Sequence, residues 1–298
     1  MSTVKKRFTI QTYNIGIVGA DVIDSGNLHG EIKWLKHCYN DRFFADPFLW
    51  YRDHEFYYIL VEEFCFFDEY GRIALLKVDK QDFSLVSRET IIQEPYHLSF
   101  PFCIEGDEHI IPESVGGNVC KIYHVSKESH TIISSSVLFD DGIIDPILFS
   151  HNGVNYILGG EKNNPSGELY MFIKNEKTEK YICSHEVSNP IVKDRGHARN
   201  AGGIFIYMDK LIRPTQDCTK RYGYAIRLME IKRMDKSEYK EVAYLSLNGG
   251  GNPPFDETLH TFNYYGEFAL LDGSKDVFAM RNIFFKVKKY LNRLRNKL

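Results

Sequence analysis

One pattern recurs along this chain and constrains its fold more than any other feature. Three stretches begin near residues 44, 98 and 143 and share one order: a strand, a polar turn, a second strand, a glycine-containing loop and a third strand. Their turns read "YRDHE", "EGDE" and "SHNG", with the Asp, Asn and Gly residues that hairpins favour. Similar units begin near residues 199 and 260, and the last one is short. We expect the N-terminal strand "RFTIQTYNIGIV" to complete it.

The repeat predicts an all-β fold, a five-bladed β-propeller over residues 1–283, followed by a short amphipathic helix at 284–298. A period of roughly 45–60 residues is typical of propellers and arrays. Aromatic residues make up 14% of the chain, which favours strands. A two-sheet β-sandwich is the alternative, but three units share an internal order and not only a composition. In a propeller the first strand of each blade lines the central channel.

Charge and composition exclude several classes of protein. The formal net charge is −3, and residues 284–298 hold six Lys/Arg and no acid, so the rest of the chain carries −9. Such an acidic body argues against a nucleic-acid partner. No run approaches the roughly 18 apolar residues of a membrane span, and polar residues interrupt any N-terminal signal core. The six cysteines form no CxxC pair, so we expect a reduced, cytoplasmic chain.

Two aspartates stand out because each interrupts an apolar run directly before a proline. Asp46 lies in "FFADPFLW" and Asp145 lies in "IIDPILF". An unpaired charge in such a run costs several kcal/mol unless it reaches water or a partner. An Asp-Pro turn is the simpler explanation for either one. Their equivalent places in two aligned units favour inner strands, with both carboxylates at the channel mouth.

The aligned units predict a polar pocket of scattered residues. The first strands supply Asp46, Ser99, Asp145, Arg199 with Asn200, and His260. The ends of the second strands supply Glu62 or Glu63, Glu113, Glu161, and Arg213 with Gln216 and Asp217, and His197 is a further candidate for substrate binding. Such a pocket suits sugars, and glycosyl transfer needs two carboxylates across one bond. Glu113 could instead cap a helix, and the arginines could be structural salt-bridge partners. The histidines lack metal-ligand spacing and the Gly-rich segments match no phosphate loop, so we expect no metal and no cofactor.

Several stretches resemble a known family in order along the chain. They are "FADPFLW", "HLSFPF", "IPES", "IIDPILF", "HARNAGGIF", "LIRPTQDCTKRYGYAIRLMEI" and "HTFNYYGEFALLDG". Together they resemble the N-terminal domain of plant glucosamine inositolphosphorylceramide transferases, whose bacterial stand-alone homologues are often encoded among surface-polysaccharide genes. More distantly, the Asp-Pro of the first unit resembles the five-bladed glycosidases of the arabinanase/xylosidase and invertase/levansucrase groups. We expect no second catalytic domain like that at the plant protein's C-terminus, so that either the propeller acts alone or its role is not catalytic.

The resemblance implies catalytic roles for Asp46, Asp145 and Glu113, the last as the acid. We expect a glycosyltransferase of cell-surface polysaccharide or glycolipid biosynthesis. Its partners would be a nucleotide- or phosphate-linked sugar donor and a glycan or lipid-linked acceptor, with Arg199 and Arg213 near the leaving group. The alternatives are a glycoside hydrolase or phosphorylase with the same carboxylates, and a non-catalytic carbohydrate-binding propeller.

The C-terminal segment predicts a membrane contact. Apolar residues at three- and four-residue steps form one face of a helix: Phe284, Val287, Leu291, Leu294 and Leu298. Basic residues occupy the other positions of this segment. A short helix is marginal alone in water and needs a surface. We expect an anionic membrane there, which would make the chain peripheral at the inner face. Docking on its own propeller or on another subunit is the alternative.

Overall fold

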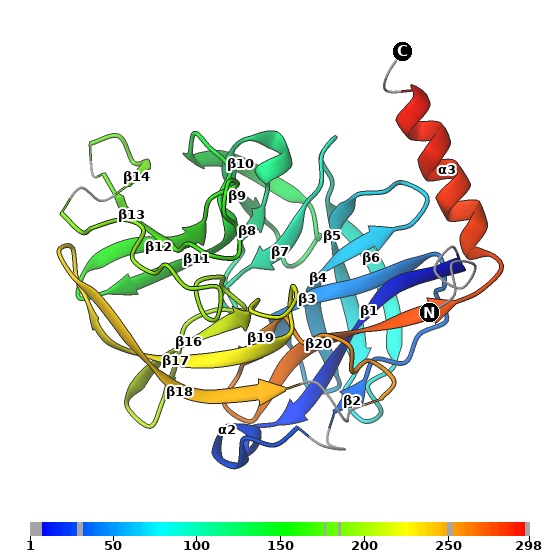
Figure 1. Ribbon diagram of the computed structural model, residues 1–298, viewed down its shortest axis with the longest axis horizontal. Coiled ribbons are helices and arrows are strands. Elements are labelled where there is room, and N and C mark those ends of the chain that lie inside the picture. The colour runs from blue at the N-terminus through cyan, green and yellow to red at the C-terminus, as the bar shows by residue number, and fades with distance from the viewer. Residues whose placement is uncertain (1–7, 29–31, 176, 184–185, 249–252, 296–298) are drawn as a thin grey trace.

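The computed structural model describes residues 8–28, 32–175, 177–183, 186–248 and 253–295. Within these ranges five four-stranded antiparallel sheets surround a common axis (Figure 1). This arrangement confirms the predicted five-bladed β-propeller and excludes the two-sheet sandwich. Each repeat unit found in the sequence corresponds to one blade, and its first strand is the innermost strand, as predicted.

The strands follow the chain blade by blade. Blade one consists of β3 (Arg42–Arg52), β4 (Phe56–Cys65), β5 (Gly71–Asp79) and β6 (Leu85–Ile92). Blade two consists of β7 (Ser99–Phe102), β8 (His109–Glu113), β9 (Cys120–Val125) and β10 (Ile132–Phe139). Blade three consists of β11 (Ile144–His151), β12 (Val154–Gly160), β13 (Tyr170–Lys174) and β14 (Tyr181–Cys183). Blade four consists of β15 (Phe205–Tyr207), β16 (Lys210–Asp217), β17 (Ala225–Met234) and β18 (Tyr239–Asn248).

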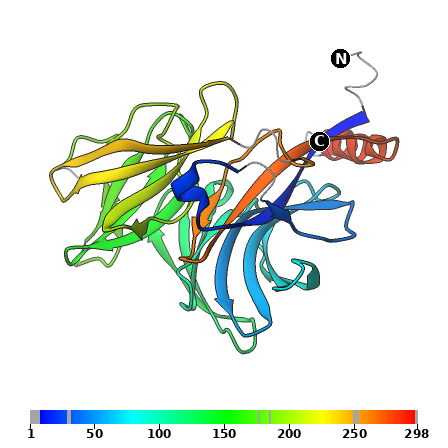
Figure 2. The same cartoon turned by 90° about the horizontal axis from the view of Figure 1, so that it is seen from below.

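Blade five joins the two ends of the chain. Its inner strands are β19 (Phe262–Tyr264) and β20 (Phe268–Phe278), and its outer strands are β1 (Thr9–Gly19) and β2 (Lys33–Trp34). β1 pairs with β20 along its whole length, from Thr9 opposite Phe278 to Gly19 opposite Phe268. The predicted completion of the short last unit by the N-terminal strand is therefore confirmed. Because the ring has no other seam, this pairing closes it (Figures 1 and 2).

The core lies where neighbouring blades pack face to face. Neighbouring blades cover both faces of the long inner strands, so these strands contain long runs of buried residues. β3, for example, buries seven residues in succession from Phe44 to Trp50. Blades five and one share a cluster that includes Ile15, Phe44 and Leu270. All six cysteines fall in the described ranges and none of them forms a disulfide.

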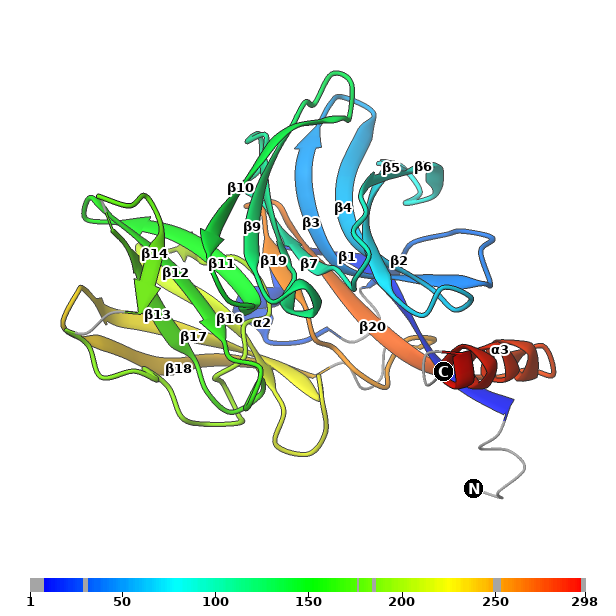
Figure 3. The same cartoon turned by 90° about the horizontal axis from the view of Figure 1, so that it is seen from above.

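Helices are few and short in the described ranges: α2 (Val22–Ser25), a 3₁₀ turn at Val115–Gly117 and α3 (Asn282–Arg295). The predicted C-terminal helix is present and begins two residues before the predicted start. It leaves the propeller edge where β20 ends and β1 begins (Figures 1 and 3). Among the described residues no helix combines the length and apolar character needed to cross a bilayer.

Candidate functional site

A repeated backbone irregularity shapes the axis of the ring. In blades one, two and three the residue before the inner-strand proline has a positive φ: Asp46 at 50°, Phe100 at 43° and Asp145 at 44°. In each blade the hydrogen-bonded ladder skips this residue and its proline. Side chains other than glycine rarely adopt this conformation, and such strained residues cluster at functional sites. Phe100, and not Ser99, is thus the structural equivalent of Asp46.

The left-handed residues link successive blades through their amide groups. The backbone N–H of Asp46 donates to Asp272 Oδ2 of blade five at 2.9 Å. That of Phe100 donates to Asp46 Oδ2 at 3.1 Å, and that of Asp145 donates to Glu113 Oε2 of blade two at 3.1 Å. In all three cases the acceptor is a carboxylate of the preceding blade. The strained backbone therefore holds a ring of acidic side chains at the axis.

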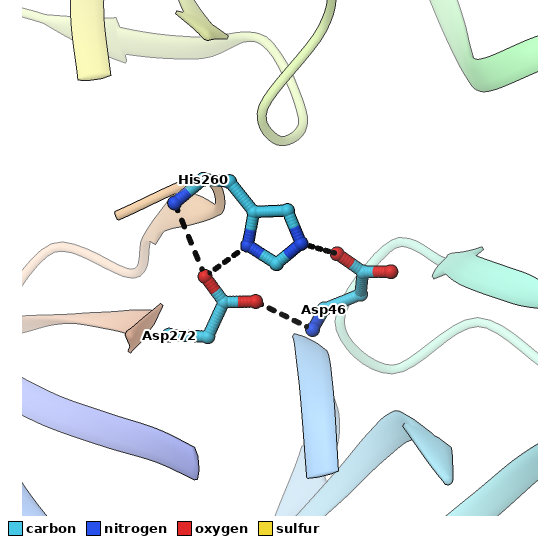
Figure 4. A group of neighbouring side chains, drawn as sticks. All are labelled: Asp46, His260 and Asp272. Carbon is cyan, nitrogen blue, oxygen red and sulfur yellow. Dashed lines mark hydrogen bonds and ion pairs between the residues drawn. The ribbon is translucent and has the colours of Figure 1, made fainter. Parts of the chain in front are cut away.

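His260 lies between two of these carboxylates (Figure 4). Its Nδ1 is 2.6 Å from Asp272 Oδ1, and its Nε2 is 3.6 Å from Asp46 Oδ1. Burial opposes a charge on this imidazole, but Asp272 and Asp46 outweigh that effect and raise the pKa of His260 to about 9. His260 is therefore a buried cation at neutral pH.

Asp46 is 5% exposed and shares its carboxylate between three neighbours. Besides Phe100 and His260, it accepts a hydrogen bond from Thr261 Oγ1 at 2.8 Å. Burial raises the pKa of Asp46 to about 6, His260 opposes the rise, and Asp272 and Asp145 add to it. Asp46 is therefore largely ionised at pH 7 and takes up a proton in mildly acidic solution.

Asp46, His260 and Asp272 also place one ligand atom each within 4.8 Å of one another, which is close enough for a shared metal ion. However, Asp272 already accepts hydrogen bonds from the amides of Asp46, His260 and Thr261 and from the imidazole. These four donors occupy the lone pairs of its two oxygens. The group fits a hydrogen-bonded imidazolium between carboxylates better than a cation site.

A second ionic group surrounds Asp145, which is 3% exposed. Arg199 Nε lies 2.6 Å from Asp145 Oδ2 and its guanidinium also approaches Glu113 at 4.0 Å. Gln216 Nε2 reaches Asp145 Oδ2 at 3.4 Å, and Asn200 donates to the Asp145 carbonyl at 2.8 Å. Blades two, three and four therefore all contribute to this group.

The surroundings of Glu113 favour its protonated form. Burial and then Asp145 raise the pKa of Glu113 well above its ordinary value, against the opposing effect of Arg199. Glu62 occupies the equivalent place in blade one, since Glu62 and Glu113 pair with Ala45 and Ser99 just before the left-handed residues. Burial, followed by Asp46 and Glu113, likewise raises the pKa of Glu62 well above its usual range. The axis thus combines protonated and ionised carboxyl groups.

Two tyrosines cover the histidine. The ring of Tyr13 lies 4.9 Å from that of His260, and the ring of Tyr222 lies 5.3 Å from it in an edge-on arrangement. The Arg199 guanidinium lies over the Tyr222 ring at 4.8 Å from its centroid. Tyr222 is 43% exposed, so it forms a boundary between these buried side chains and solvent.

The structure therefore brings together most of the predicted site residues. We define the axial cluster as the predicted residues Asp46, Glu113, Asp145, Arg199, Asn200, Gln216 and His260 together with Glu62, Thr261 and Asp272. Asp272 and Thr261 are not among the predicted residues, although Asp272 lies on the second strand of its blade, as Glu62 and Glu113 do on theirs. Aligning the short fifth unit strand by strand would have found it.

Three predicted ligand-binding residues require correction. Arg213 is fully buried, pairs with Glu241 at 2.6 Å and donates to Asn200 Oδ1 at 2.9 Å, so it supports Asn200 and does not face the axis. Asp217 is held by Arg227 at 2.7 Å and by Thr219, which fixes the turn after β16. The His197 side chain approaches Asp194 at 3.4 Å, away from the axial cluster.

Comparison with known proteins places the chain in a family. Residues 33–248 match the family model described as "Glucosamine inositolphosphorylceramide transferase 1, N-terminal". The chain belongs to this family. The matched region contains blades one to four. It includes every residue of the axial cluster except His260, Thr261 and Asp272, which belong to blade five.

Curated relatives of the chain are plant proteins. Glucosamine inositolphosphorylceramide transferase 1 of Oryza sativa subsp. japonica is 29% identical over 215 residues, which are 68% of this chain and 28% of the relative. The Arabidopsis thaliana protein of the same name is 29% identical over 211 residues, 67% of this chain and 27% of the relative. The chain thus spans little more than a quarter of the length of these relatives.

Solved structures share the propeller fold. A family 117 glycoside hydrolase of Zobellia galactanivorans superposes with a TM-score of 0.52 at 10% identity, covering 92% of both chains. A thermostable family-43 glycoside hydrolase superposes with a TM-score of 0.50 at 13% identity, covering 72% of this chain and 82% of its own. At these identities the likeness concerns the fold alone.

Proposed function

We propose that this chain is a glycosyltransferase of cell-surface polysaccharide or glycolipid synthesis and that the axial cluster is its reaction centre. One observation carries the proposal: Asp46, Glu113 and Asp145 project from three successive blades to one axis and differ in their surroundings. Membership of a family described by a transferase supports it. The curated relatives are themselves named as transferases.

The two carboxyl groups that we assign to the reaction differ in protonation. Glycosyl transfer uses a proton donor at the leaving oxygen and a carboxylate that acts as base or nucleophile. Burial keeps a proton on Glu113, which makes it the donor. Asp46, with a pKa of about 6, is mostly a carboxylate at pH 7 and accepts the proton of the attacking hydroxyl. As that oxygen bonds to the anomeric carbon, the bond to the leaving group breaks.

The cations of the cluster favour a donor whose leaving group is anionic. Arg199 is the arginine at the axis, and its guanidinium already spans two carboxyl groups. A guanidinium stabilises negative charge that develops on a phosphate-linked leaving group. We therefore assign a nucleotide- or phosphate-linked sugar as donor, a glycan or lipid-linked hydroxyl as acceptor, and the cytoplasmic face of a membrane as the place of reaction.

The test is a transfer assay with the purified chain. Nucleotide-linked and lipid-phosphate-linked sugars are each incubated with glycan and glycolipid acceptors, and products are identified by mass spectrometry. Asp46→Asn removes the base and should lower turnover by about 10²–10⁴-fold. Asp53→Asn is the matched control, because Asp53 caps the exposed turn that follows the same strand. This control should keep turnover within about tenfold of the unchanged chain.

Three outcomes would contradict the proposal. Release of free sugar without transfer would indicate a glycoside hydrolase, and saccharide binding without turnover would indicate a carbohydrate-binding propeller. Equal turnover of Asp46→Asn and Asp53→Asn would remove Asp46 from the chemistry. Circular dichroism of both variants separates a loss of chemistry from a loss of fold.

A further inference from the structure

We propose that the junction of β20 and α3 is a docking surface for an anionic phospholipid bilayer. Five apolar side chains at this junction are exposed to solvent: Phe278 (52%), Met280 (70%), Ile283 (41%), Phe284 (69%) and Val287 (50%). Single exposed apolar side chains are common, but a contiguous group marks an interaction site.

Three of them lie on one side of α3. Ile283, Phe284 and Val287 follow the three- and four-residue steps that define a helical stripe, and Met280 lies in the turn just before the helix. In the sequence Leu291 and Leu294 continue these steps.

A different side of the helix is attached to the propeller. Phe285 is buried and packs against Phe66 and Phe67, with ring centroids 5.2 Å and 4.7 Å away. Asn282 is fully buried and its side-chain amide donates to the carbonyl groups of Phe8 and Val277. Because these contacts fix the orientation of α3, they leave Phe284 and Val287 turned to solvent. Docking on its own propeller therefore does not use the exposed stripe.

A cationic cavity lies directly beside the start of this stripe. It has a volume of about 420 Å³ and its lining includes Lys36, Arg42, Lys275 and Arg281 but no acidic side chain. Arg42 and Lys36 pair with acidic neighbours outside the lining. Among the described residues, Lys275 and Arg281 make no ion pair, and the Lys275 ammonium lies over the Phe255 ring. Arg281 lies between the exposed Met280 and Ile283.

This combination matches one partner better than others. An apolar stripe beside unpaired cations is complementary to acyl chains beneath anionic head groups. The rest of the molecule is acidic, so the same field repels it and directs this edge toward the bilayer. α3 projects from the rim of the ring (Figures 2 and 3).

Vesicle flotation of the full chain tests the proposal without reference to catalysis. Vesicles of phosphatidylcholine alone are compared with vesicles that also contain phosphatidylglycerol. The unchanged chain should float with the anionic vesicles, and Phe284→Ser with Val287→Ser should bind at least about tenfold more weakly. Ile206→Ser with Met208→Ser is the matched control, because these residues are 68% and 69% exposed on blade four. It should bind like the unchanged chain.

A charge variant tests the cavity separately. Lys275→Gln with Arg281→Gln should weaken binding and reduce its dependence on salt, while Lys232→Gln with Arg233→Gln on β17 should do neither. Flotation of the Phe284/Val287 variant equal to that of its control would overturn the proposal, as would equal binding to both kinds of vesicle. A dimer in light scattering that only the Phe284/Val287 variant dissociates would assign the stripe to a second copy of the chain.

Discussion

His260 is the residue on which the axial cluster depends electrostatically. Several carboxyl groups share a small buried volume, and a single imidazolium contacts both Asp46 and Asp272. Like charges so close together cannot all ionise without a cation among them. The protonation of His260 is therefore coupled both to folding and to the ionisation of Asp46.

This coupling predicts a loss of stability in alkaline solution. Because the pKa of folded His260 is about 9, above its ordinary value of 6.5, its stabilising effect is complete below pH 6.5 and disappears as the pH rises through 9. The effect is on the order of 3 kcal/mol. Asp46, raised from 3.8 to about 6, changes stability mainly below pH 6 and outside this window. Urea unfolding between pH 6.5 and 9.5 should show this decline, and His260→Gln should make it shallower. Parallel pH profiles for the two proteins would contradict the assignment.

At the scale of elements, neighbouring blades approach each other closely at the inner strands of blades four and five. Phe262 donates its backbone N–H to the carbonyl of Ala201 at 2.7 Å, which joins blade five to the segment before β15. A Cβ atom on Gly202 would lie 2.1 Å from the carbonyl oxygen of Phe262. The glycine is required by this close approach of two backbones.

Gly202→Ala should therefore destabilise the fold by about 1–3 kcal/mol, as overpacking does in well-packed cores. Gly203→Ala is the matched control, because its Cβ would meet no atom nearer than 3.6 Å. Urea unfolding of both variants measures the difference. Equal urea midpoints for the two variants would show that the two backbones can move apart here without loss of stability.

The sequence predicted the elements better than the contacts between them. Asp46 and Asp145 could be found because two Asp-Pro strands recur in register with a period. Ser99 was predicted at the position equivalent to Asp46, which Phe100 occupies in the structure. A residue with positive φ before a proline does not change the alternation of apolar and polar residues along a strand, so the sequence pattern does not reveal it. The role of Arg213 was not predictable, because its partner Glu241 lies on β18, an outer strand whose register the repeat does not define. Asp272 was missed because the fifth unit is divided between the two ends of the chain.

At the scale of the whole molecule, the ring depends on one seam. β1 supplies the third strand of blade five, so the N-terminal segment holds the C-terminal strands in place. The same seam carries Tyr13 beside His260 and leads to α3 at the end of β20. Closure of the ring, the axial cluster and the proposed membrane surface thus share one blade.

Ile15 tests whether this seam stabilises the entire ring. Its side chain is fully buried between blades five and one, in the cluster with Phe44 and Leu270. Ile15→Ala should lower the free energy of unfolding by about 2–5 kcal/mol, whereas Ile10→Ala, on the same strand but half-buried, should cost less. If the seam couples all blades, hydrogen exchange should show faster exchange in β12 of blade three as well as in β20. A ring that opens at one seam is expected to release the packing of the neighbouring blades as well. Faster exchange confined to blade five would therefore mean that the blades unfold independently.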